Sequence, residues 1–487
     1  MQNRRFNLFL IVYFISLILL IESLFFLLAV IVSFIYREAI KEEMIYSFLV
    51  LFIPGVILYL TTFNKKINNI TRKESILIVG SGWIIMALLG ALPYIITQTI
   101  PRFSDAFFES MSGFTTTGSS ILRDIESLPR GILFWRSETN WIGGMGIIVL
   151  IIALAPIVAG NSNYLYGSEM SNVADEKLMA RFKQNARNLW LVYVGLTVAE
   201  TIILYCAGLS FLDSLCHSFS TIATGGFSMK NASIAAYSPL VQYIVMVFML
   251  LSGMNFTLHV LSIRKQFKKV IRNEELQLYL FIVVFIGTAI TLQLFFWKSL
   301  PLEVAFRDAF FQVISVITAT GFTTSDYLIW PTSAVALIML LMFIGASSGS
   351  TGGGVKVIRN LIAFKKINML FKQIFFPKAI NQIRYNGQIL KNPQVNSILT
   401  FIILYYFILG FGTLVMLTLG LDKATSFGAV ITTMGGVGPG FGMVGPAGNF
   451  ANIPEFGKFF LIIIMVLGRL EIYPVLILFT PWFWRNS

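Results

Sequence analysis

Three short stretches of the chain repeat one pattern of residues. They begin at Asp105, Asp213 and Asp308, and each reaches a glycine thirteen residues later. Glycine adopts positive φ angles easily, so the carbonyl groups beside it can turn towards a common axis. A ring of such carbonyl oxygens replaces the hydration shell of a dehydrating cation. The pattern predicts that backbone atoms coordinate a cation.

A fourth copy begins at Asp422 and has two possible alignments. Counting thirteen residues from Asp422 gives Gly435, whereas counting eleven from Phe427, the phenylalanine-to-glycine spacing of the first and third copies, gives Gly438. We choose Gly438 and keep Gly435 and Gly436 as alternatives. The candidate ion-binding residues are Thr116, Thr117, Gly118, Thr224, Gly225, Gly226, Ala319, Thr320, Gly321, Gly436, Val437 and Gly438.

Each copy lies between two apolar stretches and is too short to span a membrane. Non-helical backbone at membrane depth persists only where protein or water satisfies its polar groups. Four such segments in equivalent places favour a pore over glycines used for close helix packing. Half-helices that end at these glycines direct partially negative ends at the centre, which also favours a cation. We interpret the Asp at each start as a helix cap, with a charged vestibule as the alternative.

The composition places these segments in a bilayer. Of the 487 residues, 56% are hydrophobic and only 12% are charged, whereas a soluble domain has about 25% charged residues. The mean hydropathy is +0.79. These values exclude a soluble enzyme, a collagenous chain and a disordered protein. Cys206 and Cys216 cannot build a disulfide framework or a metal site, and His217 and His259 have no second ligand at metal spacing.

Ten apolar stretches are long enough to be considered as spans. We therefore predict an all-α integral membrane protein with ten transmembrane helices and four pseudo-fourfold helix–pore-loop–helix repeats. The expected spans are 8–35, 44–63, 76–96, 135–159, 189–209, 240–261, 276–296, 334–358, 395–419 and 458–479. The expected units are a two-helix unit at 1–70 and four repeats at 71–180, 181–272, 273–392 and 393–487.

The distribution of charge predicts the orientation. With ten spans, the loops on the side of the termini hold 24 Lys and Arg against 6 Asp and Glu, and the opposite loops hold 10 against 13. The positive-inside rule therefore places both termini in the cytoplasm. Arg4 and Arg5 precede a long apolar run without a cleavage site, which indicates a retained anchor. The basic stretch 356–391 fits ordinary topogenic charge, or in addition a surface for a cytoplasmic partner or anionic lipid.

Two further features lie within the apolar segments. Residues 345–354 contain five glycines, which a helix does not easily accommodate. This segment is either a close-packing site or an unwound, movable loop.

Arg469 lies in the last apolar stretch, where an arginine is costly unless it is paired or hydrated. We expect Arg469 to contact carbonyl groups of 345–354 beneath the turns and to oppose cation passage, and we do not expect Glu471 to pair with it.

The motifs resemble the TrkH-type membrane subunit of the bacterial Trk potassium uptake system, in the superfamily with Ktr and plant HKT transporters. The resemblance covers essentially the whole chain. It rests on MSGFTTTG at 111–118, GGMG at 143–146, STIATGGFS at 220–228, TGFTT at 320–324, GSTGGGVK at 349–356, VGPG at 437–440 and Arg469.

The resemblance implies a K+ pathway in each protomer of a homodimer in the bacterial inner membrane. It places K+ only at the filter residues named above, with Gly118, Gly226, Gly321 and Gly438 as filter glycines, and requires no organic cofactor. Glycine rather than serine at position 118 implies potassium over sodium. Gly436 departs from the Asn that many members have there.

By the same resemblance, residues 345–354 are an intramembrane gating loop. The gate residues are Gly345, Gly349, Gly352, Gly353, Gly354 and Arg469. The chain has no nucleotide-binding fingerprint, because 349–354 lacks the preceding strand and the Gly-Lys-Ser/Thr ending of a phosphate loop. Control by ATP or NAD is therefore expected from a TrkA-type cytoplasmic ring. We expect lipids but no nucleic acid as other partners.

Two other function classes were compared with a gated pore. A secondary symporter would couple K+ entry to H+ or Na+, and such transporters usually have inverted repeats. The repeats here share one orientation, which favours the pore, although coupled movement stays open. Glu22, Glu138 and Glu200 lie in or near spans and fit packing or helix ends, with ion or proton coupling as the alternative. A membrane enzyme is disfavoured because no nucleophile–base set lies in the spans.

Overall fold

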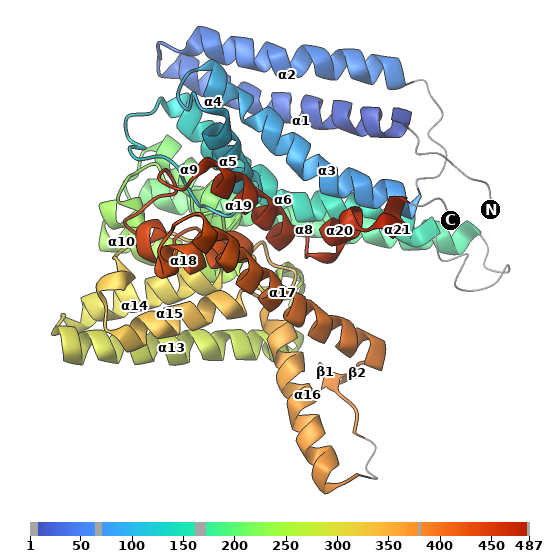
Figure 1. Cartoon of the computed structure of the whole chain (residues 1–487), viewed down its shortest axis with the longest axis vertical. Helices are drawn as coiled ribbons and strands as arrows, with labels where there is room; N and C mark the ends of the chain where they lie inside the picture. The colour runs from blue at the N-terminus through green and yellow to red at the C-terminus, as the bar shows by residue number, and fades with distance from the viewer. Residues whose placement is uncertain (1–7, 64–70, 161–171, 378–380, 485–487) are drawn as a thin grey trace.

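The computed structural model describes residues 8–63, 71–160, 172–377 and 381–484 (Figure 1). Arg4 and Arg5 lie outside these ranges. The helices are α1 Leu8–Ile35, α2 Lys41–Thr62, α3 Arg72–Gly90, α4 Leu92–Ile96, α5 Phe103–Phe114, α6 Arg130–Gly160, α8 Asn172–Cys206, α9 Phe211–Ile222, α10 Pro239–Ser252, α11 Phe256–Ile263, α12 Phe267–Ile271, α13 Glu274–Lys298, α14 Leu302–Ile317, α15 Thr332–Ile344, α16 Val357–Phe375, α17 Asn392–Thr418, α18 Lys423–Gly435, α19 Glu455–Arg469, α20 Tyr473–Leu476 and α21 Pro481–Trp484.

Short 3-10 helices and one antiparallel hairpin complete the described chain. The 3-10 helices are η1 Ser233–Ala236, η2 Tyr327–Ile329, η3 Gly442–Val444 and η4 Ile477–Phe479. In the hairpin, β1 Arg384–Tyr385 pairs with β2 Gln388–Ile389, in the register Arg384 with Ile389 and Tyr385 with Gln388. The hairpin follows α16, which projects from the bundle at the bottom of Figure 1.

Six helices within the described ranges are long and apolar enough to cross a membrane. They are 9–35, 41–62, 76–96, 184–206, 274–298 and 392–418. The bent pair α10 and α11 would make a seventh. Helices α15 and α19 have only 13 and 15 residues. The mostly helical membrane architecture is therefore present, and the count of ten spans stays a prediction.

Three expected spans are not continuous helices. The stretch 240–261 bends by 96° between α10 and α11, where the Asn255 side chain accepts a hydrogen bond from the Thr257 backbone N–H at 2.9 Å and starts a new helix. The stretch 458–479 breaks because α19 ends at Arg469, and Ile472 has a φ of +56°. The expected span 334–358 is also interrupted, as its glycines predicted: α15 ends at Ile344 and α16 begins at Val357.

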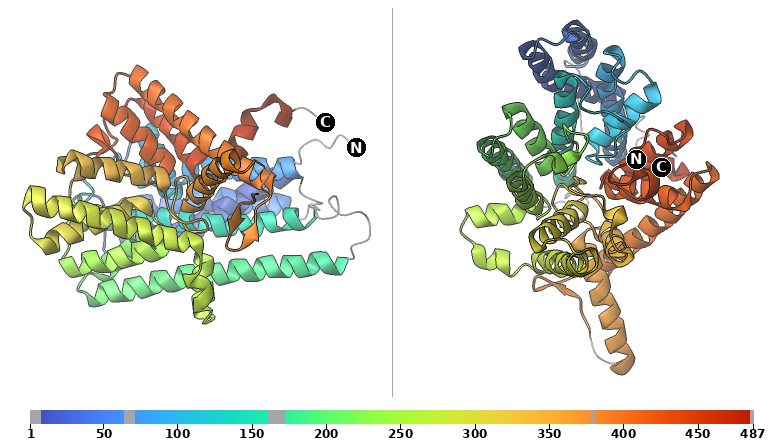
Figure 2. Two further views of the ribbon diagram at one scale, coloured as in Figure 1. Left: turned by 90° about the horizontal axis from the view of Figure 1, so that it is seen from below. Right: turned by 90° about the vertical axis from the view of Figure 1, so that its left-hand side faces the viewer.

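Four buried half-helices occupy the middle of the bundle. They are α5, α9, α14 and α18, and each lies between two other helices of its own part of the chain. Seen along the bundle (Figure 2, right), the cyan, green, yellow and orange-to-red parts surround one central region in chain order. The α1–α2 hairpin packs on the outside, against the first of these parts. This arrangement brings the C-terminal ends of the four half-helices together.

Candidate functional site

The four turns that follow the half-helices have the same backbone conformation. We refer to residues 115–118, 223–226, 318–321 and 435–438 as the four turns. In each turn two residues that are two positions apart have positive φ. The φ values are 54° at Thr116 and 77° at Gly118, 53° at Thr224 and 69° at Gly226, 58° at Ala319 and 84° at Gly321, and 67° at Gly436 and 93° at Gly438.

This pattern aligns the fourth turn with the others. Gly438 corresponds to Gly118, as the spacing from Phe427 predicted, and Gly436 corresponds to Thr116. A β-branched residue with positive φ is a genuine outlier, and such strain persists only where the surrounding structure determines it. Thr116 and Thr224 are both of this kind. The turns are therefore held in a conformation that the chain does not adopt by local preference.

Neighbouring turns touch through their backbones. A Cβ atom on Gly118 would lie 2.5 Å from the carbonyl oxygen of Gly225, in the second turn. A Cβ on Gly226 would overlap the carbonyl oxygen of Thr320 in the third turn. These contacts leave no room for a side chain, so glycine is required by packing as well as by φ.

The third turn contacts the fourth, and the fourth contacts the first, in the same way. A Cβ on Gly321 would overlap the carbonyl oxygen of Val437, and one on Gly438 would lie 3.2 Å from the carbonyl oxygen of Thr117. In every case a contacted carbonyl belongs to the residue just before the glycine of the next turn, and for Gly438 the carbonyl oxygen of Gly118 is equally close. The hydroxyl of Ser119 also donates to the Gly438 carbonyl at 3.3 Å. The four turns therefore form one closed ring, with equivalent residues at equivalent positions.

Threonine hydroxyls fix the first and third turns from within. The Thr115 hydroxyl donates to the Met111 carbonyl at 2.7 Å and lies 2.8 Å from the hydroxyl of Thr117. The third turn repeats this arrangement with Thr318 and Thr320, also at 2.8 Å. These bonds link each turn to the last helical residues of its half-helix.

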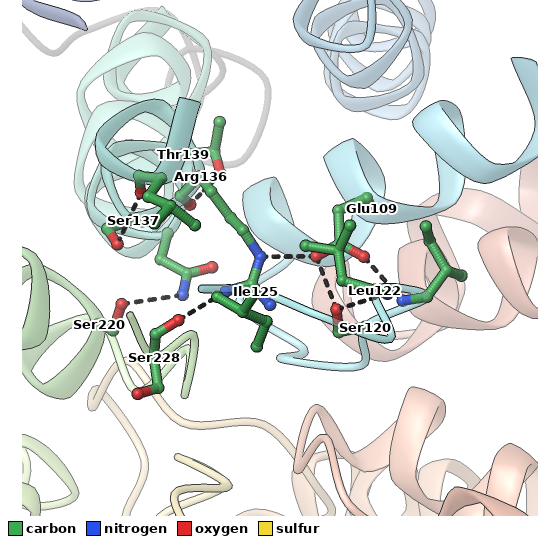
Figure 3. Close-up of polar contacts among 12 residues, drawn as sticks. Glu109, Ser120, Leu122, Ile125, Arg136, Ser137, Thr139, Ser220 and Ser228 are labelled. Carbon is green, nitrogen blue, oxygen red and sulfur yellow. Dashed lines mark hydrogen bonds and ion pairs between the residues drawn. The ribbon is translucent and has the colours of Figure 1, made fainter. Parts of the chain in front are cut away.

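A cavity of about 100 Å³ lies on one side of the ring, and all four glycines line it. Arg136 also lines this cavity, with its guanidinium 2.6 Å from the carboxylate of Glu109. Figure 3 shows this pair between α6 and α5. Glu109 also accepts hydrogen bonds from the Ser120 hydroxyl and the Ile121 N–H, both at 2.9 Å. Arg136 donates to the Ser228 carbonyl at 3.0 Å.

This ion pair connects the first turn to the second, and it was not predicted from the sequence. The Arg136 guanidinium also lies 3.6 Å above the centre of the Phe227 ring. Both charged side chains are at most 2% exposed. The signal in the sequence was one charge of each sign in otherwise apolar segments, which in a membrane protein calls for a partner.

On the other side of the ring, residues 345–356 form an irregular loop beneath the half-helices. The Thr351 hydroxyl donates to the Ile222 carbonyl at 3.0 Å, at the end of α9. A Cβ on Gly352 would overlap the Thr318 carbonyl at the end of α14, and one on Gly353 would overlap the Gly435 carbonyl at the end of α18. The loop therefore lies against the second, third and fourth half-helices.

Glycine conformations shape this loop. Gly345, Gly349 and Gly354 have φ values of 74°, 71° and 79°. Lys356 also has a positive φ, of 80°, and its ammonium group donates to the Gly352 carbonyl. Lys356 was expected as the first residue of the basic stretch 356–391, and in the structure it adds a second buried cation to the region.

Arg469 joins the loop to the remaining half-helix. Its guanidinium donates to the carbonyl of Thr351 in the loop and to that of Gly143 in α6, both at 2.7 Å. Gly143 in turn lies directly against the carbonyl of Phe114, the last residue of α5. The predicted contact between Arg469 and the loop is thus present. Glu471 pairs instead with Arg359, at 2.7 Å.

A cavity of about 440 Å³ opens beneath the loop. Its lining includes residues 352–354, Lys356, Arg469 and Glu471. The loop and Arg469 therefore separate this cavity from the ring above. The arrangement places backbone carbonyls at the ring, and a guanidinium and an ammonium group beside the loop and this cavity.

The interpretation of the four Asp residues as helix caps is right only for Asp422. Asp422 accepts a hydrogen bond from the Thr425 N–H at 3.1 Å, and its side-chain bonds to Thr425 lower its pKa. Asp105 instead binds the ammonium group of Lys458 at 2.5 Å. Asp213 follows a Ser210 cap, and Asp308 lies well inside α14 because that helix begins earlier, after Pro301.

Comparison with known proteins identifies the family. A family model described as TrkH, cation transport protein, matches residues 40–485. The chain belongs to the TrkH family. TrkH-family chains are membrane transport proteins, not enzymes.

Relatives of this TrkH-family chain are similar over nearly their whole length. The Trk system potassium uptake protein TrkH of Salmonella typhimurium is 38% identical over 461 residues, which cover 93% of this chain and 95% of the relative. The protein of that name from Escherichia coli K12 is 37% identical over 463 residues, with the same coverage. The crystal structure of the potassium transporter TrkH from Vibrio parahaemolyticus matches with a TM-score of 0.88 at 34% identity, and covers 98% of this chain and 100% of that one.

Proposed function

We propose that this TrkH-family chain carries K+ into bacteria across the inner membrane, through the ring formed by the four turns. The closed ring carries this proposal, because a backbone carbonyl of each turn lies against the glycine of the turn before it, and carbonyls arranged in a ring can replace the water around K+. The names of the relatives supply the ion, since they are called potassium uptake proteins. The ion-binding atoms are carbonyl oxygens of the twelve residues proposed from the sequence.

Two further features support a cation over an anion. The four half-helices end at the ring, so their partially negative ends lie beside the proposed ion positions. The positive charge of Arg136 beside the ring is paired with Glu109, so this cation does not stand unopposed in the cavity. Potassium rather than sodium is proposed because glycine, not serine, occupies position 118.

The gate in this proposal is the loop 345–354 together with Arg469. The guanidinium is held between the loop and α6 by two 2.7 Å hydrogen bonds, so its charge lies beneath the ring. A cation that leaves the ring towards the larger cavity meets this charge. Conduction then requires that the loop and Arg469 move together, because Thr351 binds both Arg469 and the end of α9.

Regulation is proposed to come from other chains of the Trk system, which the names of the relatives mention. A TrkA-type cytoplasmic ring that binds ATP or NAD would act on the loop, and the membrane subunit would assemble as a homodimer. Both termini and the basic stretch 356–391 are proposed to face the cytoplasm.

Uptake of 86Rb+ by proteoliposomes tests the function. The purified chain should take up 86Rb+ down its gradient, and added K+ should compete, with no dependence on pH or Na+ gradients. Competition by Na+ equal to that by K+ would contradict the proposed selectivity. A closed gate could mask uptake, so the Arg469→Ala variant is measured in parallel, and absence of uptake from both proteins would contradict the pathway.

Symport of K+ with H+ or Na+ is the second candidate, and one observation favours it. The carboxylate of Glu22 and one oxygen of Glu138 are buried and have no hydrogen-bond partner among the described residues. Glu200 is also buried, near Thr221. Uptake that needs an imposed H+ or Na+ gradient, and that Glu138→Gln or Glu200→Gln abolishes, would establish symport over a simple pore.

A further inference from the structure

A basic cluster lies at the end of the bent segment α10–α11. Five of the nine residues 264–272 are Lys or Arg, and none is acidic. They are Arg264, Lys265, Lys268, Lys269 and Arg272, and all five side chains are exposed. None of them forms an ion pair with another described residue. The five positive charges of the cluster are therefore not neutralised by a carboxylate among the described residues.

The 96° bend determines where this cluster lies. Helix α10 runs with the bundle, and the bend turns α11 across it. In Figure 2, left, the short yellow-green helix stands crosswise to the long helices. The bend is fixed by the Asn255 cap and by the hydrogen bond from the Phe256 N–H to the Gly349 carbonyl, at 3.1 Å. The chain thus turns across the direction of α10 and away from the bundle.

Large apolar side chains are exposed among these cations. Ile263, Phe267 and Ile271 are 72%, 56% and 67% exposed. Phe267 and Ile271 lie four residues apart and so share one face of α12. Apolar residues with Lys and Arg beside them are typical of a segment that lies in the membrane interface, with its apolar face in the acyl boundary and its charges among the headgroups.

A groove of about 1000 Å³ adjoins the cluster. Four of the five cations line it, and Leu258 and Leu261 form an apolar part of the lining. The opposite wall is the hairpin turn, where the Asn386 N–H donates to the Glu274 carboxylate at 2.9 Å. Glu274 also pairs with Lys365, so its negative charge is already compensated. The groove therefore combines unpaired cations with an apolar surface.

We propose that this groove binds the headgroup of an anionic phospholipid of the cytoplasmic leaflet, with Lys265, Lys268, Lys269 and Arg272 around the phosphate. The exposed Phe267 and Ile271 would then be covered by acyl chains. A lipid fits better than a soluble partner, because it satisfies the charges and the apolar side chains at once. The inference does not use the proposed K+ pathway. It rests on the proposed orientation, in which this loop lies on the Lys- and Arg-rich, cytoplasmic side of the membrane.

Native mass spectrometry of the purified full chain tests the proposal. Wild-type protein in detergent should retain phosphatidylglycerol and not phosphatidylcholine. Lys268→Gln/Lys269→Gln should weaken phosphatidylglycerol binding about twenty-five-fold, since each basic residue near an anionic surface contributes about fivefold. The matched control is Lys366→Gln/Lys372→Gln, which removes the same charge from α16, and it should change binding less than threefold.

Each other outcome overturns the proposal. Equal retention of phosphatidylglycerol by the two double variants would show that the groove is not the lipid site. Displacement of the lipid by excess inorganic phosphate would indicate a site for a soluble anion. Unchanged lipid retention, with loss of binding to a cytoplasmic Trk partner in Lys268→Gln/Lys269→Gln, would make the cluster a protein docking surface. Because no outcome depends on ion flux, failure here is separate from failure of the K+ pathway.

Discussion

The guanidinium of Arg136 lies 2.6 Å from the carboxylate of Glu109, and the pair is shielded almost completely from solvent beside the ring of four turns. Glu109 comes from the first half-helix, and Arg136 comes from α6 and reaches the second turn through Ser228. The pair therefore holds two neighbouring turns at a fixed separation.

Glu109→Gln should destabilise the protein by about 3 kcal/mol or more, because it leaves the charge of Arg136 buried without a counter-charge. Thermal unfolding of the detergent-solubilised protein measures the effect. The control is Glu303→Gln, which removes the exposed partner of Arg307 and should cost at most about 1 kcal/mol. Equal shifts of the two midpoints would argue against a structural role for the buried pair.

Gly226→Ala should abolish 86Rb+ uptake, since the added Cβ would overlap the Thr320 carbonyl and the φ of +69° disfavours alanine. Gly410→Ala is the matched control, because a Cβ there meets nothing within 4 Å and the residue lies within α17. Normal uptake by Gly226→Ala would contradict the closed ring.

Gly118→Ser should reduce the preference for K+ over Na+. A side chain at this position would press on the Gly225 carbonyl and displace it from the ring. The measurement is competition of K+ and Na+ with 86Rb+ uptake. If both competition constants keep their wild-type values, Gly118 does not belong to the selective part of the pathway.

Arg469→Gln should raise the basal flux of 86Rb+ without any partner, because it removes the positive charge beneath the ring and weakens the bridge between Thr351 and Gly143. Arg359→Gln is the control, because this arginine is on the same side of the ring but pairs with Glu471. Flux that rises equally in both variants would indicate general loosening instead of a specific gate.

The loops after the first and second turns should separate at low pH. The Asn231 side chain binds Asp124 at 2.8 Å and lowers its pKa from the ordinary 3.8, and Lys230 binds Glu126 at 2.9 Å and lowers its pKa from the ordinary 4.5. A depressed pKa contributes stability above the unfolded-state pKa, and this stability is lost as the pH falls through the folded-state pKa. Asp124→Asn/Glu126→Gln should therefore lower the unfolding midpoint at pH 7, and the difference from wild type should shrink as the pH falls to 3. A difference that persists at pH 3 would contradict this linkage.

The repeat made much of the site predictable. The spacing from Phe427 identified Gly438 correctly, because half-helices of similar length carry equivalent residues to equivalent places around one axis. The interruption at 345–354 was also visible, since five glycines remove both side-chain packing and helix propensity.

Other features depend on contacts between distant residues. The bend before Asn255 was not predicted, because the apolar pattern of the sequence continues through it. The bend depends on the Asn255 cap and on the hydrogen bond from Phe256 to Gly349. Glu109 and Arg136 are 27 residues apart, and their pairing depends on the rotation of two helices. Asp308 does not cap its helix because α14 begins at Leu302, six residues before Asp308.

All four turns of the ring belong to one polypeptide, which has a consequence for heredity. In a ring built from four identical subunits, one codon change alters all four turns at once. Here one codon change alters a single turn. The turns already differ, since Thr, Thr, Ala and Gly occupy the four equivalent positive-φ positions at 116, 224, 319 and 436. Natural selection can therefore adjust this pathway one quarter at a time.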